Sequence, residues 1–421
     1  MRPRAALLAL AGLLIATLGE ACGNGSRAGA DPIEVGALYP LSGPDRQGGQ
    51  DELRGVRLAV DLVNSAGGVH GRPVRLEAID TPGSDAVPGA IQRLRGQGVR
   101  FLLGSNGSEI SEAAGAQAFE RGMLFWETGA VGEMIGDGSG RLAFRVSPSG
   151  LVLGSSGISF VVQQVAARLH RDPASLRFVV VNVTDAYGGT VATGALQEIA
   201  RRHLDLVGRF RYAQGRLDAP SLVRRIAAVH PDALFVASYI PDGVALNREL
   251  ARHHVPLVAN IGTSSSYCMP EFGDLLGRIA VGSFATDKPD GESLNEQGLT
   301  AEGRALLHRG QAGYRARYHA EMAAPALAGF SAAWALFHDV MPSASSLTPE
   351  SVAGAALRVR LPMGSLPNGS GLELSGPGTP QPGSNLRALS VIWEWIGVRD
   401  RAVVWPPRYA TTSIKILPLA P

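Results

Sequence analysis

The stretch ALYPLSGPDRQGGQDELRGVRLAVD, residues 37–61, places a strand, a loop and a helix in direct succession. An apolar strand over 33–39 stops at Pro40, and the loop that follows contains Ser, Gly, Pro and Arg. A helix is expected over 50–65, where one stripe is apolar: Leu53, Val56, Val60 and Val63. The loop therefore lies between the carboxyl end of a strand and the amino end of a helix, where open α/β sheets bind ligands.

The alternation of strands and helices continues through the first part of the chain. Further strands are expected at 74–80, 100–104 and 123–128, and further helices at 86–97 and 109–121. The strands are continuous apolar runs, which is typical of a parallel sheet with helices on both faces. Gly67 and Gly68 are expected to end the first helix.

After 144–150 the pattern begins again. Helices are expected at 151–169, 187–202, 219–229 and 242–254, and strands at 177–183, 206–212, 232–238 and 255–262. Two such series in tandem predict two doubly wound α/β lobes. The rest of the chain is helical in pattern at 300–340, rich in Gly, Pro and Ser at 361–385, and ends in short strands at 389–395 and 401–406.

Composition narrows the possible functions. The 421 residues suit two domains, and 45% apolar with 18% charged residues indicates a globular protein. A net charge of +2 gives no reason to expect nucleic acid as a partner. Lysine occurs only at positions 288 and 415, and we attribute the preference for Arg to a GC-rich genome.

The first 22 residues resemble a bacterial lipoprotein signal peptide. Arg2 and Arg4 precede an apolar run at 5–18 that is short for a membrane span. The sequence GEAC that follows resembles the lipoprotein cleavage site, where Cys22 becomes the lipidated N-terminus, although Glu20 is unusual there. An ordinary secretory signal is the alternative. Residues 23–32 are expected to form a flexible tether, and no later segment is expected to span a membrane.

The sequence contains no pattern that favours an enzyme. Cys268 lies in SSSYCMPEF, without the basic neighbours of a catalytic thiol, and is expected to be buried and inert. Neither a phosphate-binding Gly-rich loop with Lys nor a Gly-x-Ser-x-Gly motif is present. His253 and His254 would point about 100° apart on a helix, so they do not form a metal pair. We expect no catalytic residues, no cofactor and no metal.

Four stretches, in order and spacing, resemble the periplasmic leucine/isoleucine/valine-binding protein family. They are VGALYPLSGP with GVRLAVDLVNSAGGVHGRPV, FLLGSNGS, DAYGGTVATGALQEI, and PDALFVASYIPDGVALNRELARHHV. The resemblance covers about 32–410. It implies a type I periplasmic binding protein, in which two α/β lobes with doubly wound parallel sheets are joined by a three-crossover hinge. The first lobe would be 33–147 plus about 286–380, and the second 148–285 plus about 385–421.

The resemblance also implies ligand-binding residues in the first lobe. In GSNGSEIS, backbone groups of Asn106 and Gly107 and the hydroxyl of Ser108 match the family positions that hold a ligand carboxylate. A role of Ser108 as helix cap alone is the alternative. In ETGAVGEM, Gly129 matches the carbonyl that binds the ligand's ammonium, and Val131 replaces a family Thr. The neighbours Thr128 and Ala130 are included in the predicted site, with Thr128 or Glu127 as possible substitutes for that Thr.

In the second lobe, Tyr187 and Tyr239 match two family tyrosines that close on the ligand. Thr263 or Ser264 stands where the family has a Glu that pairs with the ligand's ammonium. In the opening loop Gly48 replaces a family aromatic, and Arg46 is nearby.

These departures favour a neutral or anionic solute over a zwitterion, because a buried ammonium needs an anionic partner. The alternative is that Glu127, Asp185 or Asp242 supplies the missing acid.

The family resemblance implies an extracytoplasmic, lipid-anchored receptor for a small amino-acid-like, amide or carboxylate solute. Its partners would be an ABC permease and ATPase encoded separately, and the protein would be a monomer. The alternative is a ligand sensor on the same scaffold that signals to a membrane partner.

Overall fold

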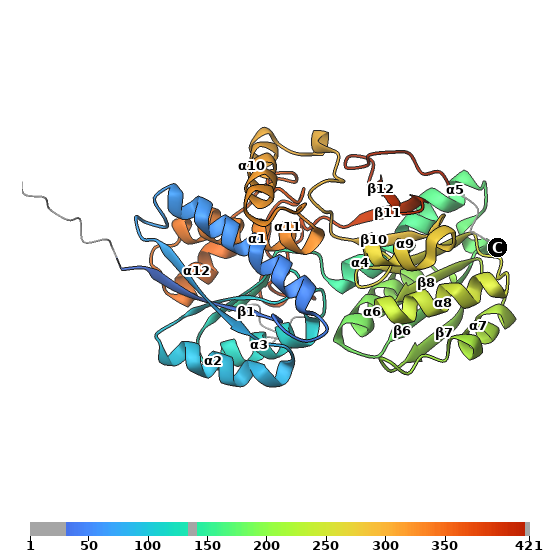
Figure 1. Ribbon diagram of the computed structural model, residues 1–421, viewed down its shortest axis with the longest axis horizontal. Coiled ribbons are helices and arrows are strands. Elements are labelled where there is room, and N and C mark those ends of the chain that lie inside the picture. Colours follow the sequence, from blue (N-terminus) through green and yellow to red (C-terminus); the bar gives the residue numbers. More distant parts are fainter. Residues whose placement is uncertain (1–30, 134–140, 417–421) are drawn as a thin grey trace, which may run out of the picture.

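The computed structural model describes residues 31–133 and 141–416, and two sheets organise them. Figure 1 shows two lobes side by side, each built on one sheet. The first sheet has the order β2-β1-β3-β4-β5, and all its pairings are parallel. Its strands are β1 (Ile33–Tyr39), β2 (Val74–Asp80), β3 (Phe101–Gly104), β4 (Leu124–Glu127) and β5 (Ala143–Arg145).

Helices cover both faces of the first sheet because successive side chains of β1 point to opposite faces. Val35, Ala37 and Tyr39 join the core under α1 (Arg46–Ser65) and α11 (Ala324–Trp334). Leu38 joins the core under α2 (Val87–Gly96) and α3 (Ser108–Glu120). The expected apolar strands and their two-sided burial are confirmed. We call this sheet, with α1, α2, α3, α10 (Ala301–Tyr318), α11 and α12 (Pro349–Ala356), the first lobe.

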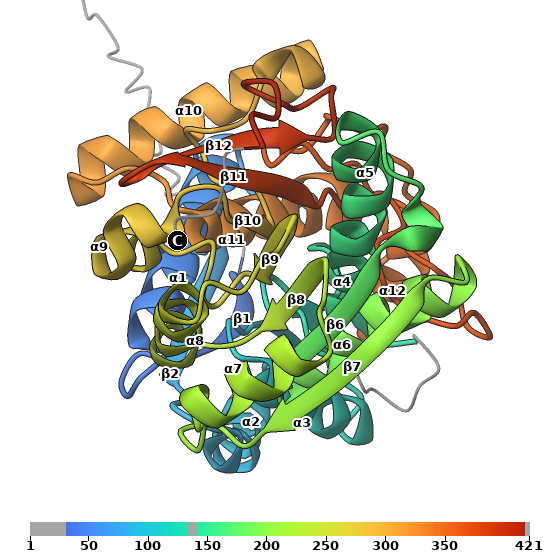
Figure 2. The same ribbon diagram turned by 90° about the vertical axis from the view of Figure 1, so that its right-hand side faces the viewer.

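The second sheet has the order β12-β11-β10-β9-β8-β6-β7. Its strands are β6 (Arg177–Val183), β7 (Asp205–Tyr212), β8 (Ala233–Ala237), β9 (Ala259–Thr263), β10 (Phe284–Asp287), β11 (Val391–Gly397) and β12 (Asp400–Trp405). Figure 2 shows them in this order, from β12 near α10 to β7 at the far edge. The last two strands run antiparallel to their neighbours, whereas the others pair in parallel.

The second sheet is also covered on both faces. Phe178 and Val180 of β6 pack with α4 (Gly150–Phe160) and α6 (Ala186–Arg201). Val179 and Val181 join the core with α7 (Ala219–Ala228) and α8 (Ile240–Arg252). We call this sheet with α4 to α8 and α9 (Pro270–Leu276) the second lobe. The predicted fold class, two α/β lobes, is confirmed.

Within the described ranges, the chain passes between the sheets three times. It leaves the first sheet after β5, returns after β10 to α10, and enters the second sheet again before β11. The carboxyl ends of β4 and β10 therefore lie where the lobes meet, as the contacts described below show.

Several expected boundaries differ from the structure. Helix α1 begins at Arg46, four residues before the expected start, so the opening loop is shorter and Arg46 is helical. The strand expected at 255–262 begins only at Ala259. Strand β10 was not predicted, because FATD is short and ends in a charge, and α9 and α12 were not predicted either.

The expectation that no later segment could span a membrane is wrong by length and composition. Gly150–Arg168 is a helical run of 19 residues with a mean hydropathy of 1.4, made of α4, a π-helical turn at Val161–Val165 and α5 (Ala166–Arg168). Half of the run is buried inside the protein, and Leu153 and Ile158 belong to the second-lobe core. A core helix of a folded domain passes the same test, so the finding is no more than weak support for a span.

Helices α1 and α11 touch backbone to backbone. A Cβ atom on Gly55 would lie 1.9 Å from the carbonyl oxygen of Ala326. A Cβ atom on Gly329 would lie 2.3 Å from the carbonyl oxygen of Glu52. This close approach fixes the position of Glu52, which takes part in the site described next.

We expect Gly55→Ala to destabilise the protein by about 1–3 kcal/mol, because the added methyl group has to push the two helices apart. Gly89→Ala is the matched control, since Gly89 is exposed on α2 and no atom lies within 4 Å of its Cβ position. There Ala should stabilise by about 0.5–1 kcal/mol through helix propensity. Urea unfolding of both variants measures the difference, and equal effects would contradict the close packing.

Candidate ligand-binding site

The opening loop is held at the carboxyl end of the first sheet. The backbone N–H groups of Leu41 and Ser42 donate to Oδ1 of Asp80, at 2.8 and 3.2 Å, and Asp80 is the last residue of β2. The loop ends at Asp45, which precedes α1. Burial raises the pKa of Asp45, and the charge of Asp185 in the second lobe adds to the shift. The loop therefore brings one acid close to another across the two lobes.

The loop after β3 contains the residues predicted to hold a carboxylate. Gly107 is the N-cap of α3, and the helix has no side-chain cap, so the alternative that Ser108 caps the helix is wrong. The Ser108 hydroxyl instead accepts a hydrogen bond from the N–H of Gly132 at 2.9 Å. The Asn106 side chain donates from Nδ2 to Oε2 of Glu52 at 3.0 Å. These bonds join the loops after β3 and β4 to each other and to α1.

Glu127 at the end of β4 is fully buried and organises these loops. Its Oε1 accepts from the N–H groups of Gly129 and Ala130 at 2.6 and 2.7 Å. Its Oε2 accepts from the N–H of Ser105 at 3.2 Å and from the Ser111 hydroxyl. Because both oxygens bind donors of the first lobe, the alternative that Glu127 pairs with a ligand's ammonium is not supported by the geometry.

Thr128 is also turned to its own lobe. It is fully buried, and its hydroxyl bonds to the Tyr39 hydroxyl at 2.8 Å and to the carboxyl of Glu52. The side chain therefore makes its hydrogen bonds within the first lobe, and the contact of Thr128 with a ligand stays a prediction. Its carbonyl accepts from the Ser147 hydroxyl at 2.8 Å.

Glu52 is a site residue that the sequence analysis missed. It is fully buried on α1, and a Cβ atom on Gly129 would lie 2.1 Å from its Oε2. Burial raises the pKa of Glu52 to about 8, and the charge of Glu127 adds to this effect, whereas bonds from Asn106 and Thr128 and the charge of Lys288 oppose it. A signal was present, because Glu52 stands one helical turn before Val56 and so lies within the apolar stripe.

Burial also raises the pKa of Glu127, to about 7, and the Arg145 charge and the donors of Ser111, Gly129 and Ala130 act in the opposite direction. A carboxylate surrounded only by donors favours its ionised form. Burial thus raises the pKa of both acids, and the donors around each oppose the shift.

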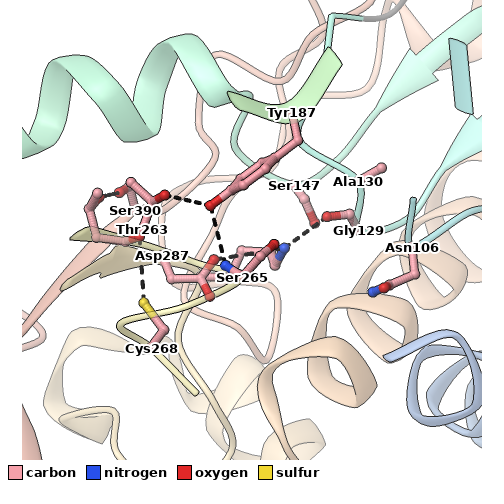
Figure 3. Close-up of polar contacts among 12 residues, drawn as sticks. Asn106, Gly129, Ala130, Ser147, Tyr187, Thr263, Ser265, Cys268, Asp287 and Ser390 are labelled. Atoms are coloured by element: carbon pink, nitrogen blue, oxygen red, sulfur yellow. Dashed lines mark hydrogen bonds and ion pairs between the residues drawn. The ribbon is translucent and has the colours of Figure 1, made fainter. Parts of the chain in front are cut away.

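Lys288 is the second residue that was missed. It follows β10 and is 8% exposed, and its Nζ donates to the carbonyl oxygen of Gly129 at 2.8 Å. The nearest carboxylate is that of Asp287, with Oδ1 3.8 Å from Nζ. The dashed line that ends at Gly129 in Figure 3 marks the bond between the lobes. The sequence did set Lys288 apart, because lysine occurs at only two positions.

In the second lobe, Tyr187 and Tyr239 lie together, with ring centroids 5.4 Å apart. The Tyr187 hydroxyl bonds to the Thr263 hydroxyl at 2.5 Å and accepts from the N–H of Ser265 at 3.3 Å (Figure 3). Burial raises the pKa of Tyr187 to about 12, and the hydroxyl of Ser264 is among the neighbours that oppose the shift. The structure thus brings Tyr187, Tyr239, Thr263 and Ser264 together, and their contact with a ligand stays a prediction.

The acids proposed as alternatives in the second lobe differ in their surroundings. Asp185 caps α6 by accepting from the N–H of Gly188 at 2.7 Å, and its Oδ2 is buried without a hydrogen-bond partner in the described part of the chain. Burial and the charge of Asp185 raise the pKa of the adjacent Tyr239 well above its usual range. Burial raises the pKa of Asp242, and the nearby Tyr212 side chain opposes the shift. Asp185 therefore stays an alternative partner for a ligand cation.

Two of the remaining predicted residues have clear environments. Arg46 is exposed at the first turn of α1, at the end of the opening loop. Cys268 is buried, its thiol donates to the carbonyl oxygen of Thr286 at 3.6 Å, and burial raises its pKa further, with a contribution from Asp287. The prediction of a buried cysteine is confirmed.

The loop 129–133 brings the lobes into contact. The N–H of Glu133 donates to the Thr190 hydroxyl of α6 at 3.1 Å, and Val131 packs in the second-lobe core. Beside this contact lies a small cavity of about 40 Å³, lined by Glu133, Arg145, Ser149, Leu151, Thr190, Pro380, Gln381, Pro382 and Ser384. Residues of both lobes and of the crossovers thus form one continuous junction, in which Figure 3 places Asn106, Gly129 and Ala130 on one side and Tyr187 on the other.

The sequence profile of the periplasmic binding protein family matches residues 32–371 of the chain. The chain belongs to this family. Periplasmic binding proteins bind solutes outside the cytoplasm and are not enzymes. The resemblance stated from the sequence is confirmed.

Three relatives of this periplasmic binding protein match most of its length. Leu/Ile/Val-binding protein homolog 8 of Brucella abortus is 25% identical over 366 residues, which cover 86% of this chain and 88% of the relative. The branched-chain amino acid transporter substrate binding protein LivJ of Streptococcus pneumoniae, solved with isoleucine, has a TM-score of 0.68 and 17% identity and covers 89% of this chain and 100% of its own. An ABC transporter solute binding protein of R. palustris, solved with benzoate, has a TM-score of 0.69 and 16% identity over 92% and 99%. At these identities the solved structures show the fold.

We expect Glu52→Gln to change how the stability of this periplasmic binding protein depends on pH. Because the folded-state pKa of Glu52 is raised from 4.5 to about 8, its contribution to stability is complete below pH 4.5 and is lost as the pH rises through 8. Glu52→Gln has no carboxyl group to ionise, so its stability does not fall in this way. The free energy of unfolding of the variant, relative to that of wild type, should therefore be higher at pH 8.5 than at pH 5.5. Thermal unfolding at both pH values measures the gain. Glu112→Gln, on the half-exposed side of α3, is the control, and identical pH profiles for wild type and Glu52→Gln would contradict the assignment.

Proposed function

We propose that this chain is an extracytoplasmic receptor that binds a small solute between its lobes and delivers it to an ABC importer. The observation that carries the proposal is the junction at the ends of β4 and β10, where groups of both lobes meet. Gly129 and Asn106 come from the first lobe, and Tyr187 and Thr263 from the second. The family supports a binding role, and its members work with ABC permeases.

We propose that 33–147 with about 286–380, and 148–285 with about 385–421, move as two units about the three crossovers. Hinge closure around a solute is a usual motion of such receptors. The protein would act as a monomer, with the permease and the ATPase as separate chains.

The solute would be a small amino-acid-like, amide or carboxylate compound. The site is rich in hydroxyl and N–H groups, and no acid occurs at 263–266. The solved relatives contain isoleucine in one case and benzoate in another, so the fold accommodates both zwitterions and plain carboxylates. We propose that this chain prefers a solute without a free α-ammonium group, because a charge buried without a partner is strongly disfavoured.

We expect isocaproate, the des-amino analogue of leucine, to bind more tightly than leucine. The reason is the missing anionic partner for the ammonium. Isothermal titration calorimetry of both compounds tests this, and a thermal-shift screen over amino acids, amides, ureas and carboxylates supports it. A solute at 100 times its Kd should add about 2.7 kcal/mol of stability. Tight leucine binding that is abolished by Asp185→Asn would show that Asp185 supplies the acid and would contradict the preference.

We propose that acyl chains on Cys22 hold the protein to the outer face of the membrane, with 23–32 as tether. Cys22 and most of the tether lie outside the described residues, so the proposal rests on the order of basic residues, apolar run and GEAC.

Cys22→Ser should therefore release the protein from the membrane, because the variant has no thiol to acylate. Fractionation of cells that produce wild type or variant measures the shift. Cys268→Ser is the matched control and should stay with the membrane, and a membrane-bound Cys22→Ser variant would contradict the lipid anchor.

A further inference from the structure

We propose that Lys288 is a specificity-determining residue whose ammonium group binds the carboxylate of the solute at the junction of the lobes. This inference rests on the proposed receptor function, because it assumes that a solute binds there. It goes further by naming one residue, Lys288, that recognises the charge of the solute.

The ammonium of Lys288 is buried but has few acceptors. Its side chain is 9% exposed, and an ammonium has three N–H donors. Within the described ranges it has one acceptor at hydrogen-bond distance, the carbonyl oxygen of Gly129 at 2.8 Å. Asp287 at 3.8 Å is too distant for a hydrogen bond. Buried donors without acceptors are costly, so the arrangement favours a ligand that brings acceptor oxygens.

The neighbouring acids do not replace such a ligand. Glu127 is bound by four donors of its own lobe, and its pKa is influenced most strongly, after burial, by the charge of Arg145. Glu52 is held by Asn106 and Thr128, and burial favours its protonated form. Burial also raises the pKa of Asp287, although Lys288 opposes the shift. The Lys288 charge therefore lacks a closely bound carboxylate.

The position of Lys288 also removes a site for a cationic ligand group. The carbonyl of Gly129 already accepts a hydrogen bond from an ammonium, so a second ammonium there would meet like charge. Across the junction, Tyr187 and Thr263 supply neutral hydroxyl groups (Figure 3). An ammonium whose nearest carboxylate oxygen, that of Asp287, lies 3.8 Å away, with neutral hydroxyl groups across the junction, suits a small monocarboxylate.

The test compares Lys288→Met with Lys415→Met, which changes the other lysine at an exposed position. The probes are isocaproate, benzoate and leucine. Their affinities are measured by calorimetry on the purified full-length protein of each variant. We expect Lys288→Met to weaken carboxylate binding by about tenfold to a hundredfold, as for the loss of a charged hydrogen bond. Leucine should lose less affinity, so the preference for isocaproate over leucine should shrink. Lys415→Met should leave all three affinities unchanged.

Lys288→Arg keeps the charge and provides a second variant if Met impairs folding. It should retain carboxylate binding better than a neutral Lys288→Gln variant of similar thermal stability, which a purely structural role of Lys288 would not produce. If wild type binds a carboxylate and Lys288→Met or Lys288→Gln binds it equally well, this inference is overturned and the receptor function stands. The same holds if wild type binds leucine but neither carboxylate. If wild type binds no solute in the screen, the receptor function itself fails, and this inference fails with it.

Discussion

The hydrogen bond from Lys288 to the carbonyl oxygen of Gly129 joins the two lobes, and the geometry of the site depends on it. Gly129 follows a strand of the first sheet, and Lys288 follows a strand of the second. Parallel strands direct their carboxyl ends to one edge of a sheet, so each lobe has one loop-bearing edge. The crossovers place these edges against each other, and the bond forms where they meet.

A buried carboxylate makes this meeting possible on the first-lobe side. Glu127 accepts hydrogen bonds from the backbone of Ser105, Gly129 and Ala130, so one side chain holds the loops after two neighbouring strands. The Gly129 carbonyl is then free to accept from the other lobe. Glu52 on α1 binds Asn106 and Thr128 of the same loops. The glycine contacts between α1 and α11 fix the position of Glu52. Burial of two acids is tolerated because each carboxyl group is bound by hydrogen-bond donors and burial raises the pKa of both.

Much of the fold could be predicted from the sequence, because apolar runs of strand length alternate with helical periodicity through both lobes. Strand β10 could not be found in this way, because FATD gains its strand structure from pairing with β9 and β11. The candidate residues Asn106, Tyr187 and Thr263 came from the family resemblance. The structure places them in the loop after β3, in the first turn of α6 and at the last position of β9.

Because β10 was not predicted, Lys288 was not recognised as a site residue, since its location depends on where that strand ends. The hydrogen-bond partners of Thr128 and Glu127 could not be predicted for a related reason. Sequence spacing places a residue in a loop, but only the packed structure shows which lobe its side chain binds. Glu52 was overlooked although it stands in the apolar stripe of α1.

The most direct test of a cationic junction uses the rarity of lysine. Labelling with isotopes in lysine alone gives NMR signals from just two side chains, Lys288 and Lys415. The account predicts that saturating isocaproate or benzoate shifts the Lys288 signal and leaves that of exposed Lys415 in place. A carboxylate that binds, as shown by thermal stabilisation, while the Lys288 signal stays unchanged would contradict the account.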